Sequence, residues 1–187
     1  PLAAIVGAVL GAGLGLAEGA AAQITAARLA VQDVDNPAEE LVYTLLTAPA
    51  VGTLSGAQGP LGQGQTFTQA HIDQGALSYT HDGSETTGDA FTFRVTDGNG
   101  GDLEGTFAIA LTPVNDRPAL DLAGDLQVDE GTVLDLVVTA RDPDGTPSLS
   151  AQGLPSFAAF TDRGDGTGTL RIAPDYAAAG VYPGLQI

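Results

Sequence analysis

Apolar and polar residues alternate along much of this chain with the period of two that half-buried antiparallel strands show. The alternation is clearest at 75–81, 90–96 and 105–112. Further strands are predicted at 41–47, 120–128, 133–140, 148–150, 167–172 and 181–187, and one helical turn at 68–74. Repeated Asp-Gly and Asn-Gly pairs between these runs are typical of tight hairpin turns. The pattern therefore predicts an all-β fold.

The segment 112–118, TPVNDRP, interrupts the strand pattern. Proline has no backbone donor and cannot lie inside a central strand, so Pro113 and Pro118 indicate a stiff connector between two folded domains. We expect domains at 14–116 and 117–187, after an apolar segment at 1–13. The first has nearly the ~100 residues of an immunoglobulin-like sandwich. The second is shorter, so the prediction is two tandem immunoglobulin/cadherin-like β-sandwiches, the second without its closing strand.

The segment 1–17 is uncharged and apolar, and it permits several interpretations. Gly7, Gly11 and Gly15 have the spacing of a membrane helix-packing face, but the run is shorter than the ~20 residues that a span needs. We expect an extended segment that contains a sandwich strand. Alternatively, residues 2–10 fill the open sheet edge of another copy, which would build a head-to-tail filament by donor-strand complementation. The simpler account is that the chain is a piece of a longer protein.

The net charge of the chain limits the classes of molecule that it can bind. The chain has 23 acidic residues against 6 basic ones, no lysine, and a net charge of −17. Such a surface excludes binding to nucleic acid or to an anionic membrane, both of which need cationic groups. Self-repulsion of this size favours the uptake of divalent cations. With 43% hydrophobic residues the chain is not expected to be disordered, and without cysteine it forms no disulfide or thiolate site.

An internal repeat is the strongest organising signal. Glu18-Gly19 is followed by a short strand and then by Asp33 and Asp35, two positions apart. The same order returns with Glu130-Gly131, a strand, and Asp142 with Asp144. Repetition of one unit is the signature of a tandem array.

Carboxylates and amides recur where calcium ligands would be needed, because calcium takes about six to eight oxygen ligands. The set expected at the connector is Glu18, Asn115, Asp116, Asp142 and Asp144. Asp33 and Asp35, together with Glu130, are expected to form equivalent half-sites at the ends of the repeats. Asp97 is expected to hold a structural ion within the first domain, with Asp82, Glu85 and Asp89. The alternative for each aspartate is a turn former whose side chain binds local amides.

Residues 81–85, HDGSE, contain a histidine, an aspartate and a serine, but adjacency in a turn does not build a catalytic triad. A non-enzymatic protein is therefore predicted. A carbohydrate-binding or protein-binding adhesin tip is a weaker possibility, because only 5% of residues are aromatic and tryptophan is absent.

With these motifs in view, the chain shows a family resemblance. The motifs YTHDGSE, FTFRVTDGNGG and TPVND occur in order within 64–118, which resembles the second half of a cadherin-like repeat of the chondroitin-sulfate-proteoglycan (NG2) type. Residues 16–54 resemble its first half, and the stretch after Asp129 resembles the immunoglobulin-like repeats of large bacterial surface adhesins.

The resemblance implies a calcium-stiffened structural repeat of a bacterial extracellular, surface or secreted protein. Its partners would be other copies or repeats of itself, or a ligand on a host or neighbouring cell.

Overall fold

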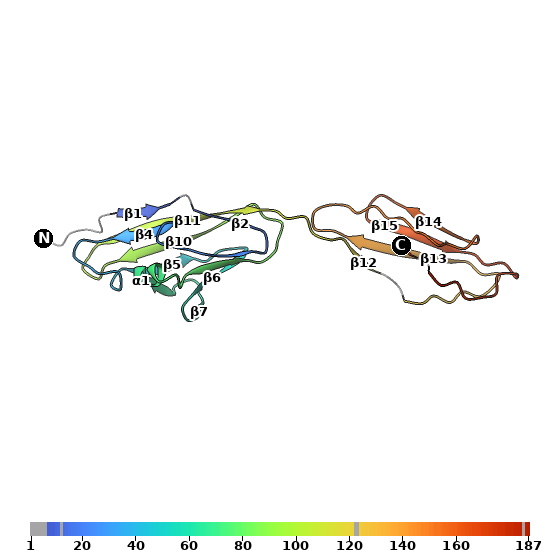
Figure 1. Cartoon of the computed structure of the whole chain (residues 1–187), viewed down its shortest axis with the longest axis horizontal. Helices are drawn as coiled ribbons and strands as arrows, with labels where there is room; N and C mark the ends of the chain where they lie inside the picture. The colour runs from blue at the N-terminus through green and yellow to red at the C-terminus, as the bar shows by residue number, and fades with distance from the viewer. Residues whose placement is uncertain (1–6, 12, 122–123, 185) are drawn as a thin grey trace. The chain divides into compact units, whose positions relative to one another are not determined.

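The computed structural model describes residues 7–11, 13–121, 124–184 and 186–187 (Figure 1). Strands dominate, and the one helix of the described residues is the short α1 (Gln69–Asp73). The predicted all-β class is therefore confirmed. The chain divides into two compact units, Pro1–Val114 and Asn115–Ile187, which are described separately below.

Two sheets and a short strand pair make up the first unit. Its strands are β1 (Gly7–Leu10), β2 (Leu14–Ala17), β3 (Ala21–Gln23), β4 (Leu29–Gln32), β5 (Val42–Thr47), β6 (Gly52–Gly56), β7 (Gly59–Pro60), β8 (Thr66–Thr68), β9 (Ser78–His81), β10 (Gly88–Thr96) and β11 (Asp102–Thr112). The larger sheet has the order β2-β11-β10-β5-β8, and the second has the order β3-β9-β6-β7. Strands β10 and β11 form a long antiparallel hairpin, beside which β2 runs parallel to β11.

A row of aromatic rings fills the space between the sheets of the first unit. Tyr43 stacks on Phe67 with ring centroids 4.8 Å apart, and Phe91 stacks on Phe107 at 5.1 Å. Phe93 lies between the two pairs, 5.4 Å from Tyr43 and 6.1 Å from Phe91. All five side chains are buried. Aromatic burial of this extent supplies much of the hydrophobic stabilisation of a small sandwich.

The helical turn α1 ties this core to its neighbours through one amide. Thr68 caps the turn by accepting a hydrogen bond from the backbone N–H of His71. The buried Gln69 accepts two hydrogen bonds at Oε1, from the Val31 N–H at 2.9 Å and from the Tyr43 hydroxyl at 2.6 Å. Burial raises the pKa of Tyr43 above its usual range, so the hydroxyl remains a donor.

The apolar N-terminal segment forms a strand within its own chain. β1 pairs antiparallel with β4, with Gly7 opposite Gln32 and Leu10 opposite Leu29. This agrees with the expected sandwich strand. Residues 2–6 of the alternative donor strand lie outside the described residues, so that alternative stays a prediction.

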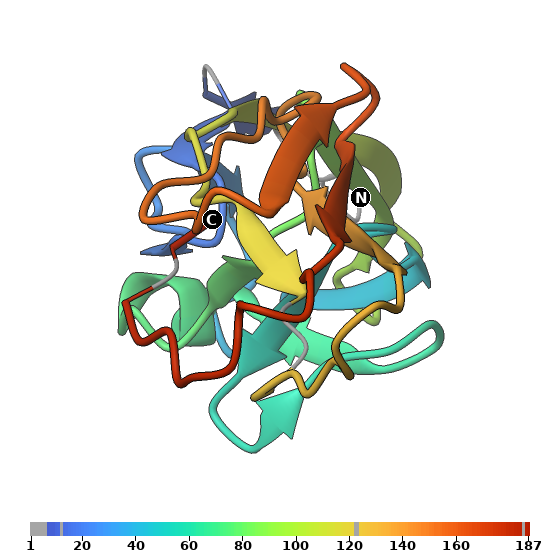
Figure 2. The ribbon, with the colours of Figure 1, turned by 90° about the vertical axis from the view of Figure 1, so that its right-hand side faces the viewer.

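The second unit contains a single sheet in its described residues. Its strands are β12 (Ala119–Asp121), β13 (Leu134–Arg141), β14 (Ala158–Asp162) and β15 (Thr167–Ile172), in the order β12-β13-β15-β14, coloured yellow to red in Figure 2. The buried Val138 and Leu170 lie on its inner face. A cavity of about 1260 Å³ adjoins that face and is otherwise lined mainly by irregular segments.

Three predicted strands of the second unit are wrong or only partly confirmed, since of the described residues in the run predicted at 120–128 only 120 and 121 form a strand, as part of β12. Residues 124–128 and 148–150 are irregular, and residues 181–187 contribute only an isolated bridge between Gln186 and Gln152. An apolar run becomes a strand only when a partner ladder accepts its backbone hydrogen bonds, and residues 124–128 and 148–150 join no ladder in the described part of the chain. Pro183 and Gly184, the latter at φ +89°, further break the last run.

Gln69→Leu should destabilise the first unit by about 2–6 kcal/mol, because two buried donors lose their acceptor at about 1–3 kcal/mol each. The free energy of unfolding from urea titration measures the effect. Gln63→Leu makes the same exchange at an exposed loop position and should change stability little. Equal losses in both variants would show that Gln69 does not anchor the helical turn.

Candidate metal centre

The turn after β4 places one predicted ligand against the protein interior. Asp33 Oδ1 accepts hydrogen bonds from the backbone N–H groups of Asp35 at 2.8 Å and Asn36 at 3.1 Å. Its other oxygen, Oδ2, is buried and has no hydrogen-bond partner among the described residues. Asp35 is exposed. The two aspartates therefore differ in their surroundings, and Asp33 is the one whose carboxylate lacks compensation.

The turn after β10 repeats this arrangement with deeper burial. Asp97 is only 3% exposed. Its Oδ1 accepts hydrogen bonds from the N–H groups of Asn99 at 2.8 Å and Gly101 at 2.9 Å, while Oδ2 is buried and unpartnered within the described part of the chain. A charged oxygen in such surroundings is expensive unless a cation or a donor reaches it.

Asn36 joins the two turns. Its Nδ2 donates to Glu40 Oε2 at 2.7 Å and to the Asp97 carbonyl at 3.3 Å, and its Oδ1 accepts from Asn99 Nδ2 at 3.3 Å. We call Asp33, Asn36, Glu40, Asp97 and Asn99 the loop cluster. Its members all carry oxygen atoms, which are the ligands that calcium prefers.

Three members of the loop cluster, Asn36, Glu40 and Asn99, were absent from the sequence-based ligand set. The available signal was the succession of Asp and Asn residues in each turn, DVDN and DGNG. Such succession does not reveal which two turns meet.

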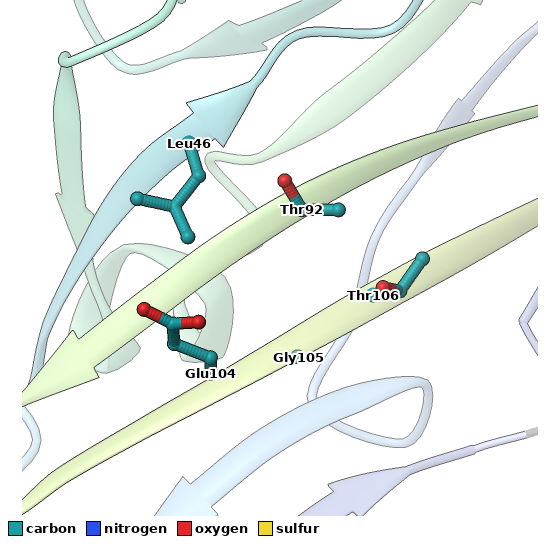
Figure 3. Close-up of a pocket in the computed structure, with 5 residues that line it drawn as sticks. All are labelled: Leu46, Thr92, Glu104, Gly105 and Thr106. Carbon is teal, nitrogen blue, oxygen red and sulfur yellow. The ribbon is translucent and has the colours of Figure 1, made fainter.

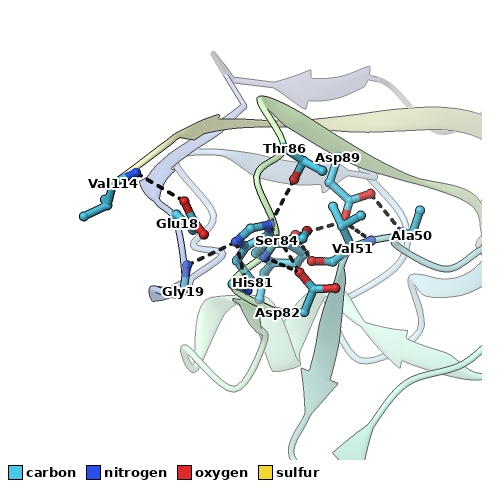
Figure 4. Close-up of polar contacts among 12 residues, drawn as sticks. Glu18, Gly19, Ala50, Val51, His81, Asp82, Ser84, Thr86, Asp89 and Val114 are labelled. Carbon is cyan, nitrogen blue, oxygen red and sulfur yellow. Dashed lines mark hydrogen bonds and ion pairs between the residues drawn. The ribbon is translucent and has the colours of Figure 1, made fainter. Parts of the chain in front are cut away.

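A second acidic position lies at the opposite end of β10. Glu18 Oε2 accepts a hydrogen bond from the Val114 N–H at 3.2 Å (Figure 4). Carboxylate oxygens of Glu18 and Glu85 lie within 4.8 Å of each other. Two carboxylates this close repel unless a cation lies between them or one is protonated.

His81 supports the turn that carries Glu18. Its Nδ1 accepts hydrogen bonds from the N–H groups of Gly19 at 3.1 Å and Gly83 at 3.3 Å, and its Nε2 lies 3.0 Å from the Thr86 hydroxyl (Figure 4). An imidazole that accepts at Nδ1 carries its proton on Nε2. His81 therefore acts as a structural hydrogen-bond centre that fixes the Glu18-Gly19 turn.

One predicted ion is wrong. Asp97 follows the C-terminal end of β10 and Asp89 lies near its start, about 25 Å away at ~3.3 Å per residue, so the two cannot share an ion. Asp89 is also satisfied within the protein, by the N–H groups of Ala50 and Val51 and by the Tyr79 hydroxyl at 2.8 Å. Burial, followed by the hydrogen bond to Asp89, raises the pKa of Tyr79.

The second unit brings together its own predicted ligands. Asp142 Oδ1 accepts from the Asp144 N–H at 2.9 Å, and Asp144 Oδ2 accepts from the Asp116 N–H. Asn115 donates through Nδ2 to the Asp116 carbonyl at 2.7 Å. Glu130 is exposed. Asp142 and Asp144 thus reproduce the bond that joins Asp33 to Asp35, as expected from the sequence repeat.

A shallow hollow of about 290 Å³ lies on the outer face of the larger sheet, lined by Leu46, Thr92, Glu104, Gly105 and Thr106 (Figure 3). Glu104 is its only titratable group. One carboxylate between two threonine hydroxyls lacks the nucleophile–base pair that covalent catalysis requires.

The sequence of residues 8–111, more than half of the chain, matches the family model described as cadherin-like. The chain belongs to the cadherin-like family. This match covers nearly all of the first unit and confirms the family resemblance. The immunoglobulin-like assignment of the second unit stays a prediction.

Relatives in this family are much longer proteins. Extracellular matrix organizing protein FRAS1 of Homo sapiens is 34% identical over 137 residues, which are 71% of this chain and 3% of that protein. Extracellular matrix protein 3 of Lytechinus variegatus is 29% identical over 140 residues, 72% of this chain and 4% of that protein. Human chondroitin sulfate proteoglycan 4 is 36% identical over 100 residues, 54% of this chain and 4% of that protein.

The cadherin-like chain thus spans only a few per cent of the length of these relatives. These relatives are extracellular matrix or cell-surface proteins, which confirms the expected extracellular location. Among the described helices, none has the length and apolar character to cross a membrane.

His81→Leu should lower the free energy of unfolding by about 1–3 kcal/mol, because the Gly19 and Gly83 N–H groups lose their acceptor. His81→Asn supplies an amide oxygen close to the position of Nδ1 and should recover part of the loss. Urea titration of the two variants measures the difference. If both lose the same stability, the acceptor at Nδ1 is not what holds the Glu18-Gly19 turn.

Proposed function

We propose that this chain is a non-enzymatic structural repeat of an extracellular matrix or surface protein, and that calcium stiffens it. Membership of the cadherin-like family and the extracellular relatives support the structural role. The acidic loops at the strand ends of the first unit support the proposal that calcium binds there. Sequence similarity to animal matrix proteins does not test the bacterial origin, which we keep as a prediction.

The observation that carries the calcium proposal is the carboxylate of Asp97. It is 3% exposed, and its Oδ2 has no hydrogen-bond partner among the described residues. The buried Oδ2 of Asp33 lacks a partner in the same way. Folding removes both oxygens from water, and a hard cation with oxygen ligands would offset the cost of that desolvation. Asp33 and Asp97 would each present one buried carboxylate oxygen to a bound cation.

Further calcium positions are proposed for the acids at and near the connector, separately in each unit. Glu18 and Glu85 supply two carboxylates in the first unit. Asn115, Asp116, Asp142 and Asp144 supply further oxygens in the second unit. Calcium bound by either set would offset the repulsion between the neighbouring carboxylates of that unit, and this stabilisation is the proposed role.

Calcium at about 10 mM should raise the melting temperature of the first unit by about 10–20 °C over the value in EDTA. The estimate takes a dissociation constant of ~0.1 mM, typical of weak extracellular sites, so that binding adds about 2.7 kcal/mol. Asp97→Asn should weaken calcium binding about tenfold by removing one charge from the ligand set. In EDTA the same variant should be at least as stable as the parent chain, because the buried oxygen anion is gone.

Glu104→Gln is the matched control, since it removes one charge from an exposed position on the outer sheet face. It should leave the calcium response unchanged. Identical melting of the parent chain in calcium and in EDTA would overturn the calcium proposal and leave the structural role intact.

A self-assembling filament subunit is a second candidate function. The cavity of about 1260 Å³ on the inner face of the second unit favours it, because a strand from another copy could fill that space. The pairing of β1 with β4 within one chain argues against it, because that pairing engages part of the proposed donor.

Light scattering and negative-stain imaging in calcium and then in EDTA separate the two functions. We expect single particles of constant mass in both, with more varied conformations in EDTA. Long regular filaments that vanish when residues 1–12 are deleted would instead establish the donor-strand function.

A further inference from the structure

The hairpin turn between β10 and β11 contains the dipeptide Asn99-Gly100 on the surface of the protein. Both residues are exposed, and the turn is rich in glycine, with Gly98 at φ +76° and Gly100 at φ +103°. The backbone nitrogen of a residue that follows asparagine can attack the asparagine side-chain amide. Glycine hinders that attack least because it has no side chain.

Hydrogen bonds in this turn leave the attacking nitrogen free. The N–H groups of Asn99 and Gly101 are both held by Asp97 Oδ1, at 2.8 and 2.9 Å. The N–H of Gly100, between them in sequence, takes part in no hydrogen bond within the described part of the chain. Asp97 therefore anchors the two flanking amides and leaves the one nitrogen that reacts unengaged.

We propose that Asn99 is a site of spontaneous deamidation, and that the product changes the cation affinity of the loop cluster. The Gly100 nitrogen forms a bond to Asn99 Cγ, and the side-chain nitrogen leaves as ammonia, which closes a succinimide ring. Water then adds to either ring carbonyl and opens the ring. The products are aspartate or isoaspartate at position 99, so the net change is loss of ammonia and gain of water, with no oxidant or reductant.

Deamidation of Asn99 affects the loop cluster because Asn99 belongs to it. The bond from Asn99 Nδ2 to Asn36 Oδ1, 3.3 Å long, loses its donor. A new carboxylate appears two residues from Asp97, whose Oδ2 is already buried without a partner in the described residues. Without a cation the added charge repels its neighbours, and with a cation it supplies a further ligand. Deamidation is thus a one-way change that makes the loop cluster more dependent on its ion.

The other two asparagines are built-in controls. Asn36 precedes Pro37, which has no N–H to attack with. Asn115 precedes Asp116, whose N–H is engaged by Asp144 Oδ2. Neither position offers a free, unhindered nitrogen.

The purified chain is incubated in EDTA at mildly alkaline pH, and peptide mapping by mass spectrometry follows the exchange of NH for O at each asparagine. Asn99 should convert about tenfold faster than Asn115, because only Asn99 is followed by a glycine with a free nitrogen. Asn99→Gln should abolish the product in the same peptide, since the longer side chain does not close the five-membered ring. Conversion of Asn99 no faster than Asn115 overturns the deamidation site.

The second part of the inference rests on the proposed calcium function and is tested separately. Asn99→Asp, which mimics one product, should bind calcium about tenfold more tightly than Gln63→Glu, which adds one negative charge at an exposed position outside the proposed calcium ligands. Equal affinities would overturn the link between deamidation and the loop cluster. Absence of calcium binding in the parent chain and in both variants would sink the calcium function itself, while the mass-spectrometric result at Asn99 stands on its own.

Discussion

A buried carboxylate with one unpartnered oxygen, that of Asp97, is the interaction on which this end of the first unit depends. Its Oδ1 organises the β10–β11 turn through two backbone amides, and the Asp97 carbonyl receives Asn36 from the turn after β4. The fold thus brings two acidic turns together and leaves the Asp97 carboxylate with one oxygen that has no hydrogen-bond partner among the described residues. In a chain of net charge −17, few internal cations are available to balance it.

The sandwich makes this arrangement possible because its core is independent of the acidic turns. The aromatic row from Phe67 to Phe107 and the amide of Gln69 hold the strands in register. The strand ends then project their turns from a rigid base, and β10 keeps the acids at its two ends about 25 Å apart. The acids at one end of β10 therefore cannot share ligands with the acids at the other end.

The turn chemistry recurs in the second unit, whose core is less complete. Gly19 and Gly131 both adopt positive φ, at +64° and +74°, directly after Glu18 and Glu130. Only glycine adopts this conformation without strain, so the Glu-Gly pairs mark the same backbone turn in both units. The two units thus share the same turn chemistry, although the described residues of the second unit form a single sheet.

The sequence by itself determined the all-β class, most strands of the first unit, the helical turn at α1 and the paired Asp turns. These features are local, since alternation, capping and Asx geometry involve residues a few positions apart. Only the tertiary structure decided which polar and acidic residues of the turns lie close together. Asn36 reaches Asp97 across 61 positions of sequence, while Asp89 and Asp97, near in sequence, are separated by the length of β10. It also decided that residues 124–128 and 148–150 stay irregular, because a strand requires a partner ladder and no local pattern supplies one.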